Sequence, residues 1–273
     1  MSGEPPDRED DGSQGVTGVV PGGRVRHGTG VNSTRAFPTE SYPHALDPFV
    51  LFERFYIDPD QGFPMHPHRG FEIVSYMLDG GMDHEDSLGV AHTAREGDAM
   101  RITTGGGIRH SEFPAGDAGC NGLQLWVNLP RDLKEIDADY ADADAAALPT
   151  TEHDGATVTT VLGEGSPLEL HTPVEYRDVR VDDAWTWTVP DGWSGFVFGV
   201  AGAGTVDGDP LGVGDVLPLP EARAVELVAD DGVDGPDATT PTTPDDDDDP
   251  FRVVCVAGRP HGEPIRQRGP YVL

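Results

Sequence analysis

The fold is decided by residues 62–114, which read GFPMHPHRGFEIVSYMLDGGMDHEDSLGVAHTAREGDAMRITTGGGIRHSEFP. Near the start of this stretch, His66 and His68 lie two positions apart, and near its end His110 and Glu112 have the same spacing. Side chains two apart on a β-strand point to the same face. Two such strands side by side would direct three imidazoles and one carboxylate into a common space. The stretch therefore predicts a metal site inside a β-structure.

The donor set indicates which ion would bind. Neutral imidazole nitrogens together with a carboxylate oxygen suit divalent iron, manganese, nickel, copper or zinc, and we expect one such ion per chain. Four protein ligands on an octahedral ion leave two neighbouring positions for a bidentate substrate or for dioxygen. The three glycines at 105–107 permit positive φ and close approach, which would turn His110 and Glu112 inward.

Other residues compete for roles at this site. Glu72 would share a strand face with His66 and His68 if one strand ran through all three, so Glu72 is an alternative ligand and Glu112 would then be a turn carboxylate. His84, within MDHEDSLG, is the candidate for a residue that supports the ligands from behind. The remaining histidines of interest lack a partner at ligand spacing and are expected at the surface or in hydrogen bonds: His92, His153, His171 and His261.

Strand patterns continue on both sides of the metal-site stretch. Alternating or β-branched runs predict strands within 16–25, 45–57, 71–78, 90–103 and 123–130, and again within 156–163, 179–190, 194–208, 210–220, 224–230 and 251–258. Between the two groups, residues 132–149 are rich in alanine and aspartate and place apolar side chains at helical spacing, which predicts a short helix and a linker.

These patterns divide the chain into parts. The prediction is a disordered tail over 1–15, a metal-binding domain over 16–140, a linker over 141–155 and a similar all-β domain over 156–273. Within the last domain, residues 233–250 are rich in proline and threonine and end in consecutive aspartates, which predicts an exposed acidic loop.

Composition restricts the partners. The chain has 49 acidic and 18 basic residues, a net charge of −31, and only one lysine, Lys134. Such a chain would repel nucleic acid and anionic membranes, and its acidity is typical of proteins that work in a salt-rich cytoplasm. Its two isolated cysteines, Cys120 and Cys255, indicate neither a disulfide framework nor a thiolate metal site. The absence of a signal peptide or a long apolar run favours a cytoplasmic protein, and we expect a monomer.

Several motifs resemble those of the pirin family, a branch of the cupin superfamily: HPHRGFE, MDHEDSLG, TTGGGIRHSE, LQLWVNLP and AGRPHGEPIRQRGPYV. The resemblance implies two tandem cupin-type β-barrels (double-stranded β-helix, or jelly-roll), stacked face to face and here joined by a short helical linker. It implies one metal ion, most often Fe(II), in the N-terminal barrel, with His66, His68, His110 and Glu112 as ligands. The second half has no H-x-H pair, so its barrel is expected to be free of metal.

The resemblance also implies two activities. Some pirins resemble quercetin 2,3-dioxygenases, which open a flavonol-like enol with O₂; Glu112 would then take the substrate proton as general base. Others are metal- or redox-sensing regulatory proteins that bind protein partners without catalysis. A metal that only holds the barrel shut is the third alternative.

Overall fold

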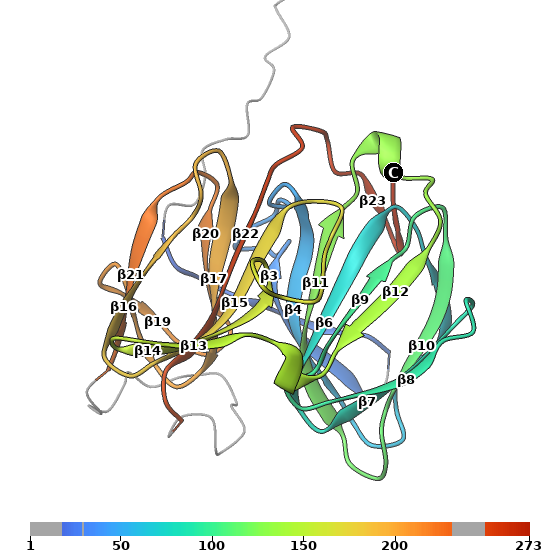
Figure 1. Ribbon diagram of the computed structural model, residues 1–273, viewed down its shortest axis with the longest axis horizontal. Coiled ribbons are helices and arrows are strands. Elements are labelled where there is room, and N and C mark those ends of the chain that lie inside the picture. The colour runs from blue at the N-terminus through green and yellow to red at the C-terminus, as the bar shows by residue number, and fades with distance from the viewer. Residues whose placement is uncertain (1–17, 29, 231–248) are drawn as a thin grey trace, which may run out of the picture.

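The computed structural model describes residues 18–28, 30–230 and 249–273. The predicted tail at 1–15 and nearly all of the predicted acidic loop at 233–250 lie outside the described residues. Within them the protein is built almost entirely of antiparallel strands arranged as two barrels, which stand side by side in Figure 1. The predicted all-β, two-barrel fold is confirmed.

The N-terminal barrel consists of a seven-stranded and a four-stranded sheet. The larger sheet has the order β12 (Asp139–Ala143), β9 (Ala99–Thr103), β6 (Phe71–Asp79), β11 (Cys120–Asn128), β4 (Phe49–Ile57), β3 (Val31–Phe37), β2 (Gly23–Arg26). The smaller sheet has the order β5 (Phe63–His68), β10 (Ile108–Pro114), β7 (Gly81–Asp86), β8 (Ala91–Arg95).

The C-terminal barrel repeats this plan. Its larger sheet has the order β1 (Val20–Pro21), β20 (Asp215–Leu219), β17 (Ser194–Ala201), β22 (Arg252–Gly258), β15 (Val174–Val181), β14 (Ala156–Leu162), β13 (Thr150–His153). Its smaller sheet has the order β16 (Ala184–Thr188), β21 (Ala224–Ala229), β18 (Gly204–Val206), β19 (Asp209–Leu211). A final hairpin joins β23 (Gln267–Arg268) to β24 (Tyr271–Val272).

The two larger sheets pack against each other through one apolar core. Alternate residues of each central strand face this core, as the period of a strand requires. Phe52 of β4 lies 4.9 Å from Phe196 and 5.1 Å from Phe198 of β17, measured between ring centroids, and all three side chains are fully buried. Burying a side chain of this size stabilises the fold by about 1.5–3 kcal/mol, so the barrels hold each other together.

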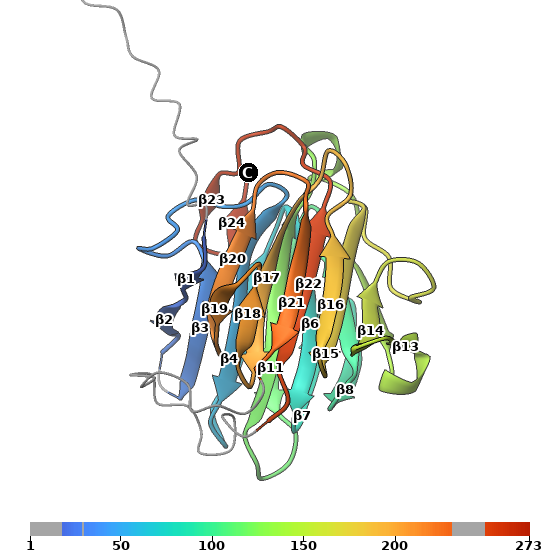
Figure 2. The ribbon, with the colours of Figure 1, turned by 90° about the vertical axis from the view of Figure 1, so that its left-hand side faces the viewer.

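Both ends of the described chain cross between the barrels. β1 pairs with β20, so the first strand belongs to the C-terminal barrel's sheet (Figure 2). After β22 the chain runs over the top of the molecule to the N-terminal barrel (Figure 1), where Tyr271 forms a parallel bridge with Arg69. The C-terminal segment therefore lies next to the metal-site strand β5.

The predicted helix within 132–149 is wrong. This region contains two short 3₁₀ turns, η1 (Arg131–Leu133) and η2 (Ala145–Ala147), with strand β12 between them. Tyr140 pairs with Ile102 of β9, and its ring stacks on His84 at 4.9 Å. Tertiary packing of one aromatic side chain on an alternating Asp/Ala sequence therefore outweighs the helical propensity of the alanines.

None of the described residues lies in a helix with the length and apolar character that a membrane crossing requires.

Candidate metal centre

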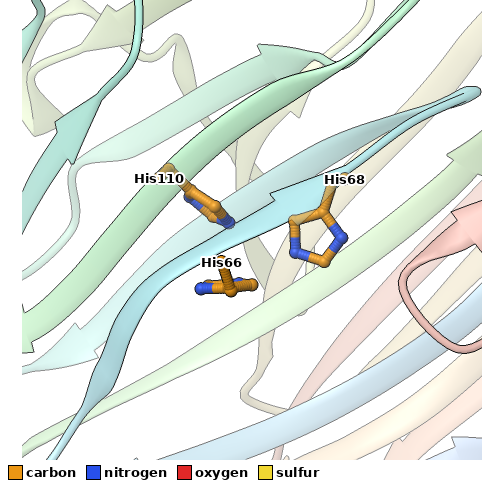
Figure 3. Close-up of side chains that lie close together, drawn as sticks. All are labelled: His66, His68 and His110. Carbon is orange, nitrogen blue, oxygen red and sulfur yellow. The ribbon is translucent and has the colours of Figure 1, made fainter.

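Three of the predicted ligands meet inside the N-terminal barrel. His66 and His68 lie on β5 and His110 on the neighbouring antiparallel strand β10, where His110 is the direct partner of His66. Their ring centroids are 4.7 Å (His66–His68), 4.4 Å (His66–His110) and 5.0 Å (His68–His110) apart, and Figure 3 shows the three rings gathered between the strands. One nitrogen of each ring lies within 4.8 Å of the other two.

The fourth predicted ligand, Glu112, lies deeper on β10. The register of β10 against β5 shifts between His110 and Glu112, so that Glu112 pairs with Phe63. Its buried carboxylate forms a second group with His110 and His84 of β7, again with one ligand atom from each within 4.8 Å of the others. His110 belongs to both groups and links the three-histidine cluster to the carboxylate.

The unpaired polar atoms of this region fit a bound cation. Both ring nitrogens of His110, the Oε1 of Glu112 and the Nδ1 of His84 are buried without a hydrogen-bond partner in the described part of the chain. Each such atom costs about 1–3 kcal/mol unless it finds a partner. Imidazole nitrogens and a carboxylate oxygen are the donors that divalent transition metals take, so these residues could hold one.

Burial sets the protonation of the candidate ligands. Desolvation is the main cause that lowers the pKa of His110 to about 2 and that of His68 to about 4, and it also lowers the pKa of His66. All three rings are therefore neutral at neutral pH, the form that binds metal. Burial raises the pKa of Glu112 to about 7, against a hydrogen bond from Gln124 that lowers it.

Backbone carbonyls orient two of the ligand rings. The Nδ1 of His66 donates to the carbonyl oxygen of Pro64 at 2.9 Å, and the Nδ1 of His68 donates to that of Pro270 at 3.2 Å. Each bond leaves the Nε2 as the nitrogen with a free lone pair, and such bonds fix the tautomer and the direction of metal-binding histidines.

His84, predicted as a supporting residue, is held in place by its own partners. Its Nε2 lies 3.2 Å from Oδ2 of Asp86, and its ring stacks on Tyr140. Asp86 is in turn fixed by the backbone N–H groups of Leu88 and Val90 at 2.8 and 3.1 Å. The Nδ1 of His84 is buried without a hydrogen-bond partner among the described residues, and the ring belongs to the group that includes Glu112 and His110.

The alternative ligand Glu72 is in neither of the two clusters of possible metal ligands among the described residues. The chain reverses at Gly70, whose φ is +87°, so β5 ends in the smaller sheet and β6 begins in the larger one. Glu72 consequently faces the other barrel. Its carboxylate accepts a hydrogen bond from Thr103 of the neighbouring strand β9 at 2.7 Å, and two from the backbone and ring of His171 in the C-terminal half at 2.9 and 3.0 Å. His66, His68 and Glu72 therefore do not share a strand face, because the histidines lie on β5 and Glu72 lies on β6.

Among the histidines that lack a partner at ligand spacing in the sequence, two have the hydrogen bonds that we expected. His171 donates to Glu72, and the Nε2 of His261 lies 2.9 Å from the Thr172 hydroxyl. His153 is exposed in the C-terminal barrel. His92 has one buried ring nitrogen without a partner among the described residues and lies 3.9 Å from Asp142.

Sequence reasoning missed the supports of the site. Pro270 is 202 residues from His68 and contributes only a carbonyl, which no side-chain motif reveals. Tyr140 was assigned to a helix. Asp86 could have been found, because it lies two residues from His84 and on the same face of one strand.

The fold and the histidine cluster define a two-barrel protein of the cupin type. A sequence profile of the family described as Pirin matches residues 30–127. The pirin of Rattus norvegicus is 36% identical over 238 residues, covering 84% of this chain and 77% of that protein. The chain belongs to the pirin family.

Two solved structures share the fold. A quercetin 2,3-dioxygenase from Acinetobacter baumannii is 25% identical with a TM-score of 0.78, covering 94% of this chain and 90% of its own. A bacterial pirin from Escherichia coli, solved in complex with nickel(II), is 21% identical with a TM-score of 0.66, covering 88% of this chain and 95% of its own.

Proposed function

We propose that this protein is a metal-dependent dioxygenase of the quercetin 2,3-dioxygenase type, which cleaves a flavonol-like enol with O₂. The observation that carries the proposal is that His66, His68 and His110 form one cluster inside the barrel and that His110 links it to a second with Glu112 and His84. Both nitrogens of His110 and one oxygen of Glu112 are buried without a partner among the described residues. The likeness to a quercetin 2,3-dioxygenase at 25% identity supports it.

His66, His68, His110 and Glu112 are the proposed ligands of one divalent ion, for which Fe(II) is our first choice and manganese, nickel, copper or zinc the others. The nickel(II) bound to the E. coli pirin supports metal binding in this fold. A bound ion would supply Lewis acidity toward the enol oxygens and access to O₂ chemistry.

The chain's own residues prepare the substrate. Glu112, buried with one free carboxylate oxygen, is the proposed general base that takes the enol proton. Trp126 and Phe71 lie 5.0 and 5.3 Å from the His68 ring and form an apolar wall beside it. This wall keeps water from the ring and strengthens electrostatic interactions in the site.

The test is incubation of the purified protein with quercetin in air and under anaerobic conditions. We expect loss of the flavonol absorbance only with O₂, and none with the His66→Ala variant. His153→Ala, which removes an exposed histidine of the other barrel, should keep the wild-type rate. Metal-loaded wild-type protein that leaves quercetin unchanged in air would refute the activity.

A second candidate is the metal- or redox-sensing regulatory role without catalysis. It is favoured by sequence similarity, because the relatives named pirin are 34–36% identical to this chain, whereas the quercetin 2,3-dioxygenase structures are 22–25% identical. With a net charge of −31, a protein partner fits this role better than nucleic acid. Metal-dependent capture of a partner by a protein inactive on quercetin would support it.

We infer that the protein is a cytoplasmic monomer adapted to high salt. The excess of 31 acidic over basic residues and the single lysine support the adaptation to salt. Light scattering at low and at molar salt concentration tests this inference. The protein should be a monomer at molar salt, with the same hydrodynamic radius as at low salt.

A further inference from the structure

Basic residues gather at one place in this acidic chain. A hollow of about 210 Å³ beside the N-terminal barrel is lined by eight residues, of which four are basic and one, Glu263, is acidic. The basic residues are Arg131, Lys134, Arg266 and Arg268. In the whole chain acidic residues outnumber basic ones 49 to 18, so the charge of this hollow is opposite to that of the protein. We call it the arginine pocket.

The pocket is formed by two segments that the fold fixes in place. Turn η1 carries Arg131 and leads to Lys134, whose Nζ donates to the Gly70 carbonyl at 2.8 Å and to the Val272 carbonyl at 3.3 Å. Lys134 thereby ties the C-terminal segment to the end of β5. The carboxylate of Glu263 accepts a hydrogen bond from the backbone N–H of Arg131 at 3.0 Å. One oxygen of the Glu263 carboxylate is thus occupied by a backbone hydrogen bond.

The three guanidinium groups of the pocket have no partner within the described part of the chain. No hydrogen bond or ion pair joins the side chains of Arg131, Arg266 and Arg268 to residues in 18–28, 30–230 or 249–273. Asn128, Lys134 and Glu263 complete the polar lining. Guanidinium groups form paired hydrogen bonds with carboxylate and phosphate oxygens, so the lining matches a small oxyanion.

The arginine pocket adjoins the metal centre. A second, larger hollow of about 550 Å³ shares Arg268 and Leu273 with it and is lined further by His68, Ile108, Arg109 and Tyr271. Tyr271 and Ile108 offer apolar surface, and His68 is a proposed metal ligand. A molecule with an apolar body and one anionic group would fit the two hollows together.

We propose that the arginine pocket binds the carboxylate or phosphate group of a small molecule whose body occupies the hollow beside His68. This identification of the molecule as a substrate rests on the proposed function; the binding of the anion does not. The substrate class is then an anionic aromatic enol, with its charge held by Arg266, Arg268 and Arg131.

The test is calorimetric titration of the purified full chain with three probes: benzoate, the neutral benzamide and inorganic phosphate. We expect benzoate or phosphate to bind at least 10-fold more tightly than benzamide. The double variant Arg266→Ala/Arg268→Ala should lose at least 10-fold in affinity for the anion. The matched control Arg95→Ala/Arg180→Ala removes two exposed arginines elsewhere and should bind like the wild type.

Each outcome decides the proposal. Benzoate binding that exceeds phosphate binding assigns the pocket to carboxylates, and the reverse assigns it to phosphates. Equal binding of benzamide and benzoate, unchanged affinity in the double variant, or no binding of either anion by the wild type would overturn the proposal. Thermal melts of both double variants confirm that they are folded.

The result separates this inference from the proposed function. Arginine-dependent anion binding in a protein that does not consume quercetin keeps the pocket and rejects the dioxygenase. Quercetin consumption without arginine-dependent anion binding supports the dioxygenase and rejects the arginine pocket. Where both hold, benzoate should raise the KM for quercetin without changing kcat, and this effect should vanish in Arg266→Ala/Arg268→Ala.

Discussion

The two barrels have the same sheets of seven and four strands but opposite interiors. The smaller sheet of the N-terminal barrel directs His66, His110 and Glu112 inward, whereas that of the C-terminal barrel directs Trp187 and Leu227 into an apolar core. Among the described residues, all groups with metal-ligand geometry lie in the N-terminal barrel. One scaffold thus carries a cluster of possible metal ligands in one copy and an apolar core in the other.

This difference has an energetic meaning. Buried apolar side chains stabilise the C-terminal barrel, although Trp187 Nε1 and the Tyr176 hydroxyl are buried there without a partner among the described residues. In the N-terminal barrel, atoms of this kind gather at one place, on His84, His110 and Glu112, and cost free energy until something binds them. The C-terminal barrel and the core between the barrels compensate for that cost. The comparison predicts that substitutions in the two interiors have separable effects on metal binding and on stability.

The largest expected effect is the loss of metal from the His110→Ala variant. His110 belongs to both ligand groups, and even partners of ligands contribute about 10- to 100-fold to metal affinity, so we expect a loss greater than that. Elemental analysis should find about one ion per wild-type chain and almost none in the variant. A variant with full metal content would show that the N-terminal interior is not the metal centre.

A large effect on stability alone is expected from Leu227→Ala. Leu227 is fully buried in the C-terminal core, and truncating such a leucine costs about 2–5 kcal/mol of unfolding free energy. Urea denaturation measures this loss, and metal content should stay that of the wild type. Loss of the ion together with stability would mean that the two interiors are coupled.

A smaller effect is expected from the metal itself. Binding to the folded state alone stabilises by about 2.7 kcal/mol at a free-ion concentration of 100 times Kd. Adding Fe(II) under anaerobic conditions should therefore raise the melting temperature of the chelator-treated wild type and of Leu227→Ala, but not of His110→Ala. Equal shifts in all three proteins would indicate binding at the acidic surface instead.

The smallest expected effect is a pH dependence at Glu53 of β4, a buried carboxylate whose charge acts on Glu112. Burial by itself would raise the pKa of Glu53, but hydrogen bonds from His27 and Arg35 and the Arg35 charge outweigh it and lower the pKa below 4.5. The ionised carboxylate therefore contributes stability above about pH 4.5 that is lost as the pH falls through the lower folded-state pKa. Wild type and Glu53→Gln should differ in urea midpoint at pH 7 and converge at low pH; a constant difference would contradict this.

The ligand cluster could be predicted because it depends on a local rule. Spacing of two on β5 and on β10 places His66, His68 and His110 on inward faces whatever the rest of the chain does. The same rule failed for Glu72, because the left-handed Gly70 ended one strand and began another in a different sheet. The rule that residues two apart share a strand face holds only within one continuous strand, and one residue with positive φ can end that strand.

The parts that could not be predicted depend on contacts between distant residues. Tyr140 lies in a strand because His84 and β9 are there to receive it. The carbonyl of Pro270 reaches His68 only because the last segment crosses to the other barrel. Neither contact leaves a periodic signal in its own stretch of sequence, so local pattern reasoning assigned a helix to the first and no role to the second.

The exchange of strands between the barrels limits how this protein can be re-engineered. A half-length fragment cut out around strands β5 and β10 would lose the Pro270 contact and expose the aromatic ring of Phe52, which the other half now covers. Such a fragment would expose a large apolar sheet face and would be expected to aggregate before its activity could be assayed. Any compact catalyst designed from this chain has to start from both halves.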